Sequence, residues 1–414
     1  MKFTPDFDIA ICGGGMVGAT FAALLSNEPS LADLRIALIE SRLPVTPPPA
    51  GVELRVSAIS RASERILTRA GAWQLLPAAQ RCAYQQMRVW DAHTPVDAAA
   101  VLQFSASALG EPNLGYIIAN NWLQWVALEA TRQGRVTCFA AELSSIELTD
   151  TAATIRLQDG RQITTRLVVG ADGANSMSRA CVGIQTQVRA YQQSAVVTQI
   201  RTERSHQFTA WQRFMPTGPL AFLPLNDGTC SIVWTTTPEH AVQLLALDTN
   251  SLATEVASAS DHILGDIKVL AKAVMFPLQV AHVDQYSRPR FVLVGDAAHS
   301  IHPLAGQGVN LGLMDAASLV QVLTQARQAG ASLDSLSELA VLRRYERWRK
   351  TENTLALGLV DSLNRLFSNE YRSAGVLRRS GLAAIEKVAV LKRSLMLRAL
   401  GLAGEVPDIV RQAS

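Results

Sequence analysis

The stretch 295–312, "GDAAHSIHPLAGQGVNLG", gathers an aspartate, two histidines, a proline and four glycines. Asp296, His299 and His302 are spaced by three residues, so on one helix face they could ligate a metal or form an acid–base pair. Alternatively, the glycines carry the function by letting a ligand approach the backbone. These alternatives predict different classes of enzyme.

Pro303 argues against a helix through both histidines, because the residue before a proline is pushed out of the helical region. The sequence instead predicts a loop that leads into a helix near Gly308. A metal site needs three or four ligands, and no Cys, Glu or third His lies nearby, so we expect no metal. The histidines are expected to brace the loop, with His299 the better candidate for a direct, catalytic part in substrate handling. The sequence identifies no other catalytic base.

The N-terminal stretch 7–26, "FDIAICGGGMVGATFAALLS", predicts a buried strand, a turn and a helix. Gly13, Gly15 and Gly18 fit the pattern G-x-G-x-x-G, which allows a tight turn, the approach of a pyrophosphate and close packing of helix on strand. A second strand, "LRIALIE", ends at Glu40, about where an acid binds a ribose hydroxyl. The stretch predicts a dinucleotide site, and the acid suits FAD or NAD better than NADP.

Two later segments repeat the design of an apolar strand that ends in a glycine and an aspartate. They are "TTRLVVGADGANSMSR" (164–179), with Asp172, and "PRFVLVGD" (289–296), with Gly295 and Asp296. Each strand would deliver its carboxylate to the carboxyl edge of a sheet, where ligands of open α/β sheets bind.

These three motifs, in this order, resemble those of the FAD-dependent aromatic hydroxylases, the single-component flavoprotein monooxygenases, over about residues 6–345. The segments "LRVSAIS" (54–60), "FMPTGPLAFLPL" (214–225), "HPLAGQGVNLGLMDA" (302–316) and "LRRYERWRK" (342–350) are most similar to the hydroxylases of ubiquinone biosynthesis. The resemblance implies FAD as cofactor and NAD(P)H as a transient electron donor. It also implies hydroxylation of a phenolic, polyprenylated ring by dioxygen through a flavin hydroperoxide.

The resemblance further implies roles for single residues. Arg55 would contact the phosphate and ribityl side of the flavin, Asp296 a ribityl hydroxyl, and Asp172 the pyrophosphate region. Asn120 would lie near the flavin, although Ala119 stands where the family often has an acid. The expected cofactor-binding set is Gly13, Gly15, Gly18, Glu40, Arg42, Arg55, Asn120, Asp172, Gly295, Asp296, Pro303, Gly306, Gln307, Gly308 and Asn310.

The elements that position these residues predict an α/β fold. We expect a Rossmann-like FAD-binding domain (1–80, 109–181 and 284–345), an inserted antiparallel β-sheet substrate domain (81–108 and 182–283) and a helical C-terminal region (346–414). The resemblance implies that the inserted sheet covers the flavin and forms the substrate pocket. Candidates for its lining are Trp211, Phe214, Pro216, Pro219 and Phe222, for each of which a place in the sheet core is an equally good interpretation.

Composition and charge limit the classes of partner and the compartment that we expect for this protein. A formal charge of +3 gives no signal for nucleic acid, and five scattered cysteines without a CxxC favour a reducing cytoplasm. We expect no signal peptide and no membrane-spanning segment, because the sequence has no basic n-region with a cleavage site and no sufficiently long apolar run. Between Tyr371 and Arg398, however, seven Lys or Arg face one acid at amphipathic spacing. This tail predicts peripheral contact with a membrane or a biosynthetic complex, or a helix packed on its own domain.

The sequence therefore predicts an FAD-dependent hydroxylase with a hydrophobic aromatic substrate and dioxygen as co-substrate. Two alternatives remain open at this point. One is a flavin-dependent reductase or dehydrogenase of an isoprenoid, and the other is a non-catalytic flavoprotein subunit of a biosynthetic complex. The oligomeric state is not determined by the sequence.

Overall fold

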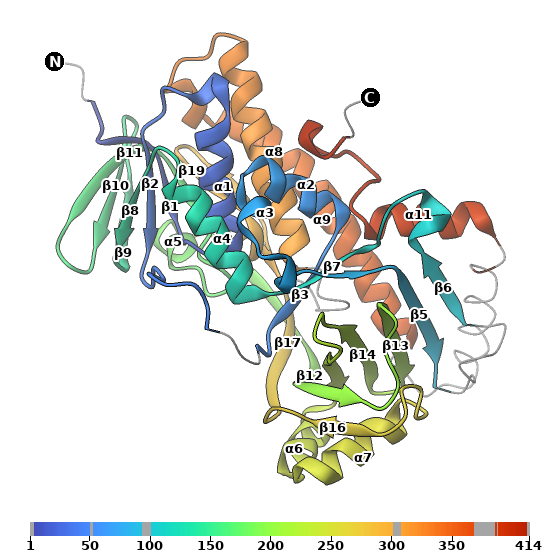
Figure 1. The fold of residues 1–414 in the computed structure, drawn as a ribbon. Coiled ribbons are helices and arrows are strands. Elements are labelled where there is room, and N and C mark those ends of the chain that lie inside the picture. Colours follow the sequence, from blue (N-terminus) through green and yellow to red (C-terminus); the bar gives the residue numbers. More distant parts are fainter. Residues whose placement is uncertain are drawn as a thin grey trace.

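The computed structural model describes residues 4–49, 53–92, 101–300, 308–367, 386 and 388–411. Figure 1 shows two large sheets that are joined by the long strands β12 (Thr186–Thr202) and β17 (Val274–Val283). Helices surround the first sheet, whereas the second sheet is covered at its outer end by α6 (Pro238–Ala246) and α7 (Thr249–Ala259).

The first sheet has the strand order β18-β19-β11-β1-β2-β8. Its centre is parallel and almost fully buried, as expected for strands with both faces covered. The parallel strands are β1 (Phe7–Cys12), β2 (Ile36–Glu40), β8 (Val136–Ala140), β11 (Gln162–Gly170) and β19 (Phe291–Leu293). The antiparallel strands β9 (Leu143–Leu148), β10 (Ala153–Leu157) and β18 (Ser287–Arg288) complete it.

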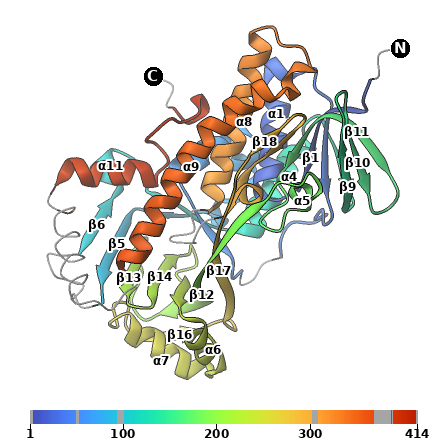
Figure 2. The ribbon, with the colours of Figure 1, turned by 180° about the vertical axis from the view of Figure 1, so that it is seen from behind.

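Four long helices pack around this sheet and around one another. Helix α1 contacts both α4 and α8, and α8 contacts α9. Figure 2 shows α9 crossing the molecule on the side opposite to that of Figure 1. Their bounds are α1 (Met16–Asn27), α4 (Asn120–Arg132), α8 (Gly308–Gln328) and α9 (Leu339–Phe367).

The second sheet has the order β20-β17-β12-β15-β14-β13-β5-β6. Its other strands are β5 (Gln86–Asp91), β6 (Leu102–Ser105), β13 (Thr209–Met215), β14 (Gly218–Pro224), β15 (Cys230–Thr236), β20 (His299–Ser300) and β16 (Ile267–Val269), which pairs with β12. The pairs are antiparallel except β13 with β5, which run parallel, so the expectation of a wholly antiparallel sheet needs this correction. The reason is that β5 comes from an earlier segment and joins the edge of the sheet from outside the hairpin series.

A small third sheet lies between the two large ones. It consists of β3 (Val56–Ile59), β7 (Gly115–Ala119) and β4 (Cys82–Tyr84), and β7 leads directly into α4. Shorter helices complete the described chain: α2 (Arg61–Arg69), α3 (Ala72–Leu75), α5 (Met177–Cys181) and α11 (Ala389–Ala399).

The predicted fold class is confirmed, as are the strands ending at Glu40 and Gly170 and the helix that begins at Gly308. The hairpin turn at 226–228 joins β14 to β15, as expected. Within the described ranges, no helix is both long enough and apolar enough to cross a membrane. Of the predicted basic tail, residues 371–385 and Lys387 lie outside the described residues.

Candidate active site

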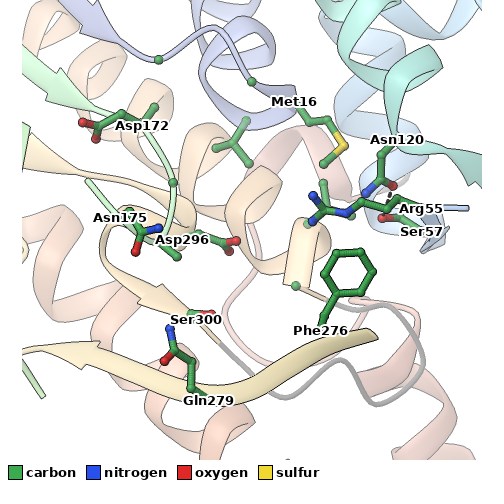
Figure 3. Close-up of a pocket in the computed structure, with 18 of the residues that line it drawn as sticks. Met16, Arg55, Ser57, Asn120, Asp172, Asn175, Phe276, Gln279, Asp296 and Ser300 are labelled. Carbon is green, nitrogen blue, oxygen red and sulfur yellow. Dashed lines mark hydrogen bonds between the residues drawn. The ribbon is translucent and has the colours of Figure 1, made fainter. Parts of the chain in front are cut away.

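One large pocket, with a volume of about 1070 Å³, lies between the two sheets. Its first wall is the carboxyl edge of the parallel sheet, including the turn after β1 and the segment after β11. Its second wall is one face of β12, β13, β14 and β15, together with β17. Figure 3 shows side chains from these walls converging on the pocket, with Asp172 and Asp296 toward the left of the view, Arg55 toward the right, and Phe276 and Gln279 of β17 below.

The turn between β1 and α1 is built by three glycines with different constraints. Gly13 has a φ of +107°, and a Cβ at Gly18 would lie 2.0 Å from the Gly13 carbonyl oxygen, so both are required by the backbone packing. A Cβ at Gly15 would meet nothing within 4 Å, and Gly15 lines the pocket. Gly15 is also the N-cap of α1 and gives it no side-chain cap. The first N–H groups of α1 are therefore available to an anion.

Glu40 lies at the end of β2 and is oriented by the chain. Its Oε2 accepts a hydrogen bond from Gly14 N (2.7 Å), and its Oε1 accepts one from Arg42 N (2.9 Å). The carboxylate still lines the pocket and keeps further lone pairs for a ribose hydroxyl. Arg42 is exposed and does not line the pocket. It contributes to the site through the hydrogen bond from its backbone N–H to Glu40.

Asp172 lies on the segment between β11 and α5. Its carboxylate accepts hydrogen bonds from Ser178 N (2.8 Å) and Ser178 Oγ (2.7 Å), and Ser176 also donates to it. These bonds hold Asp172 against the start of α5 while it lines the pocket beside Asn175.

Arg55 and Asn120 lie on the opposite rim. The Arg55 guanidinium lies 5.5 Å from the centre of the Phe276 ring, and both residues line the pocket. Asn120 begins α4, and its Oδ1 accepts a hydrogen bond from Ser57 Oγ at 2.7 Å. Figure 3 shows the side chain of Arg55, the residue just before β3, extending above the ring of Phe276 on β17.

Asp296 projects into the pocket from the turn after β19. Desolvation by the surrounding protein raises its pKa, whereas the charges of His299 and Arg55 act in the opposite direction. The side chain has no hydrogen-bond partner from the described residues. It is therefore available to a ligand hydroxyl.

His299 does not line the pocket. Its ring is almost completely buried, and its Nε2 lies 2.5 Å from Asp315 Oδ2 on α8. The same carboxylate accepts hydrogen bonds from Gly295 N (3.0 Å) and Arg349 Nε (2.8 Å). The structure thus places His299 and Gly295 behind the turn that carries Asp296, where they support it.

Asn310 is also a supporting residue. Its amide donates to Ala58 O (2.8 Å), and its Oδ1 accepts from Ser60 N (3.0 Å) and Ser63 Oγ (2.7 Å), which joins α8 to β3 and α2. Gly308 lines the pocket at the start of α8. His302, Pro303, Gly306 and Gln307 lie outside the described residues.

The second wall contains one of the five residues expected there. Pro219 lines the pocket, whereas Trp211 and Phe222 belong to the apolar core on the opposite face of the sheet, which α6 and α7 cover. Phe214 and Pro216 are not part of the lining. Side chains alternate along a strand, so it is Gln212 and Ala221, the neighbours of Trp211 and Phe222, that face the pocket.

Sequence reasoning missed Asp315 and Arg349. Asp315 is the only acid in the long apolar run "NLGLMDAASLVQVL", which is a signal for a buried carboxylate, because such a charge is kept only when it is paired. Burial alone would raise the pKa of Asp315, but the charges of His299 and Arg349 outweigh it and hold the pKa well below its usual range.

The pocket fits a dinucleotide that carries a flavin. It offers uncapped N–H groups and open space at Gly15, a fixed carboxylate at Glu40, and the free carboxylate of Asp296 beside the cation of Arg55. In the described part of the chain, no group of three or more His, Cys, Asp or Glu side chains could hold a metal ion.

Comparison with known proteins agrees with this geometry. The profile of the FAD binding domain family matches residues 6–351. The 3-demethoxyubiquinol 3-hydroxylase of Escherichia coli (strain K12) is 37% identical over 400 residues, covering 95% of this chain and 98% of that protein. Human mitochondrial ubiquinone biosynthesis monooxygenase COQ6 is 35% identical, covering 94% and 92%.

Among solved structures, p-nitrophenol 4-monooxygenase PnpA from Pseudomonas putida DLL-E4 superposes with a TM-score of 0.75 over 96% of this chain and 98% of that chain. Its sequence is 19% identical, so this similarity concerns the fold. The chain therefore belongs to the FAD binding domain family and to its FAD-dependent monooxygenases, as the three motifs predict.

Proposed function

We propose that this protein hydroxylates a phenolic ring, namely a polyprenylphenol intermediate of ubiquinone biosynthesis, with FAD as cofactor, NAD(P)H as transient electron donor and dioxygen as co-substrate. The observation that carries the proposal is the single pocket in which the nucleotide cradle at α1 faces an apolar wall of the second sheet. The 37% identity to the 3-demethoxyubiquinol 3-hydroxylase of Escherichia coli, along nearly the whole of both chains, supports the substrate class.

FAD, when bound, supplies the redox chemistry, by taking electrons from NAD(P)H and activating dioxygen. The residues of this chain would hold it along the first wall. The N–H groups at Gly15 would bind the pyrophosphate, Glu40 a ribose hydroxyl, and Arg55 and Asp296 the flavin side. Asp172 would orient the segment beside the pyrophosphate through its bonds to α5.

The second wall would bind the aromatic substrate and exclude water. Its lining is mainly small and apolar, with Ala195, Val197, Ala221 and Val233 facing the pocket. A dry, apolar surface favours an uncharged ring with a hydrocarbon tail, and it protects the activated oxygen from unproductive decay.

The test is NAD(P)H oxidation by the purified holoenzyme, with and without a prenylated phenol, under labelled dioxygen. Hydroxylation requires substrate-stimulated oxidation and one labelled oxygen atom in the product. Substrate turnover without label would favour a reductase or dehydrogenase of an isoprenoid. A flavoprotein that neither oxidises NAD(P)H nor alters the phenol would favour a non-catalytic subunit.

We further propose that the protein is cytoplasmic and contacts the inner face of the membrane, or a biosynthetic complex there, through its basic C-terminal helices. Exposed apolar side chains on α11 support this: Val390 is 81% exposed and Leu391 is 45% exposed, close to Arg393. Flotation with vesicles that contain anionic lipid would test the contact, since Val390→Asp should weaken it. The three-part division of the chain given above is retained as our proposal for its domains.

A further inference from the structure

Two buried polar side chains interrupt the apolar part of the second wall that β12–β15 form. Gln212 on β13 and Thr235 on β15 both line it, yet their exposed fractions are only 5% and 2%. The side chains around them on the same face are apolar: Ala195, Val197, Pro219, Ala221, Leu223 and Val233. A buried amide and a buried hydroxyl in such surroundings call for hydrogen-bond partners.

The described residues provide no such partners. Neither the side-chain amide of Gln212 nor the hydroxyl of Thr235 forms a hydrogen bond within that part of the chain. Gln199 on β12 is a partial contrast: it is equally buried and its amide nitrogen donates to Thr229 Oγ1 at 2.6 Å, while its Oε1 has no partner among the described residues. Gln212 and Thr235 thus face the pocket with hydrogen-bonding capacity that the protein itself leaves unused.

The register of the sheet places the two groups on either side of a flat apolar floor. Gln212 is paired with Ala221, and Ala221 with Val233, so Gln212 and Val233 lie two strands apart. Thr235 is two residues beyond Val233 on the same face. From ordinary strand spacings, the Cα atoms of Gln212 and Thr235 are roughly 12 Å apart. The reach of the glutamine side chain brings the two polar groups closer, to a span that suits a substituted ring.

We propose that Gln212 and Thr235 recognise the oxygen substituents of the aromatic substrate and thereby fix which edge of the ring faces the first wall. An amide and a hydroxyl can each donate to an ether or carbonyl oxygen and accept from a phenolic O–H. The floor of Ala221 and Val233 contacts the ring face between them. This inference rests on the proposed hydroxylase function, and it makes both residues determinants of specificity rather than catalytic residues.

The physical reason for selectivity is the unused hydrogen-bonding capacity. A site that buries polar groups against a ligand rejects an analogue that cannot pair with them, because those groups then lose water without compensation. An apolar wall alone would discriminate weakly among rings of similar size. Gln212 and Thr235 therefore supply the discrimination between substrates that the apolar wall lacks.

The test uses the FAD-loaded protein and three probes: a phenol with a methoxy and a prenyl group, the same phenol without the methoxy group, and prenylbenzene without either oxygen. Binding is followed by the change in flavin absorbance. Wild type should bind the first probe at least ten-fold more tightly than prenylbenzene. In the variant with both Gln212→Leu and Thr235→Val, this preference should fall to about three-fold or less, whereas Thr235→Ser should retain it. A double variant that discriminates as strongly as wild type overturns the inference.

Thermal unfolding without substrate gives a second, independent readout. Gln212→Leu removes no hydrogen bond within the described protein, so it should melt no lower than wild type. The matched control Gln199→Leu breaks the bond to Thr229 and should melt lower, while the probe preference stays unchanged. A clear loss of stability in Gln212→Leu would show a structural role and overturn the inference.

The two readouts separate the inference from the proposed function. If wild type binds none of the three probes, the proposed substrate class is wrong, and with it the substrate role given to this pair. If wild type prefers the oxygenated probes and the double variant does so equally, the substrate class stands and only the role of Gln212 and Thr235 is overturned.

Discussion

Arg349 on α9 donates from its Nε to Asp315 Oδ1 on α8 at 2.8 Å, and both side chains are almost completely buried. The other oxygen of Asp315 accepts from Gly295 N, at the base of the turn that carries Asp296. Asn353 also donates to Asp315, at 3.1 Å. The ion pair thus connects α8 and α9 to the position of a carboxylate that lines the pocket.

Breaking this pair should be costly, because one charge is left buried without its partner. We expect Arg349→Leu to lower the free energy of unfolding by about 3–5 kcal/mol, measured by denaturant titration of the apoprotein. The control is Arg344→Leu, which removes an exposed arginine of the same helix whose guanidinium donates to Gln325. A loss below about 1 kcal/mol for Arg349→Leu, similar to that of the control, would contradict the role given to the ion pair.

Substitutions of two glycines near the start of α1 should distinguish an effect on cofactor binding from an effect on folding. Gly15→Ala adds a Cβ into open space in the pocket, so the apoprotein should unfold as wild type does while FAD affinity falls at least ten-fold. Gly18→Ala places its Cβ 2.0 Å from Gly13 O, so it should destabilise the apoprotein itself. Flavin titration and thermal unfolding distinguish the two effects. Equal flavin affinity in Gly15→Ala and wild type would argue against the phosphate site.

Asp296 should govern flavin retention. Asp296→Ala removes the carboxylate that faces the pocket, and the variant should purify largely without FAD. By contrast, Asp284→Asn neutralises an exposed carboxylate outside the pocket lining and His302→Ala alters a residue predicted to brace the loop, so both should keep FAD. Bound flavin per protein, read from the absorbance ratio, is the measurement.

The pKa of Asp296 adds a pH dependence to this prediction. Because desolvation raises that pKa, the carboxylate becomes protonated at a higher pH than an ordinary aspartate would. Protonation removes an acceptor for a ribityl hydroxyl, so FAD affinity should fall as the pH decreases, beginning above the ordinary range of an aspartate. An affinity that is constant down to pH 4 would contradict the assignment.

His282 should make folding stability depend on pH. Burial lowers its pKa to about 4 from 6.5, and the charges of His299 and Lys350 add to the effect. Since the unfolded chain binds this proton more readily, the stabilisation is complete above about pH 6.5 and is lost as the pH falls toward 4. The change should amount to roughly 1–2 kcal/mol, less than the full shift would give, because water screens the half-buried ring.

The measurement is the free energy of unfolding between pH 4 and 8 for wild type and His282→Asn. The variant should show a shallower slope in this window, because the group that takes up the proton is absent. It also loses the 2.9 Å bond to the Tyr286 hydroxyl, so its stability at pH 8 should be lower. If the free energies of unfolding of the two proteins changed with pH in parallel, His282 would be excluded as the source of the pH dependence.

The sequence predicted the first wall of the pocket well. Each motif there follows a buried parallel strand, and parallel strands bring their carboxyl ends to one edge, so Glu40, Asp172 and Asp296 had to converge once the strands were identified. The start of α8 was also predicted, because Pro303 and the glycines interrupt any earlier helix.

Which side chains form the second wall of the pocket depends on the tertiary structure. Strands β13 and β14 carry apolar side chains on both faces, since one face packs under α6 and α7 and the other lines the pocket. Alternation along a strand defines two faces but does not say which one the helices cover. This is why Trp211 was a candidate for the lining, whereas its neighbour Gln212 occupies it.

The sequence likewise did not predict which residues pair with the buried charges. The buried charges of Asp315, His299 and Arg349 lie far apart in the sequence, between positions 299 and 349. Only the packing of α8 against α9 brings them together. By itself the sequence determined the cofactor, the edge of the sheet that binds it and the class of chemistry, because these depend on local patterns of strand, glycine and acid. The supporting network and the choice of pocket face depend on contacts between distant segments, and those exist only in the folded chain.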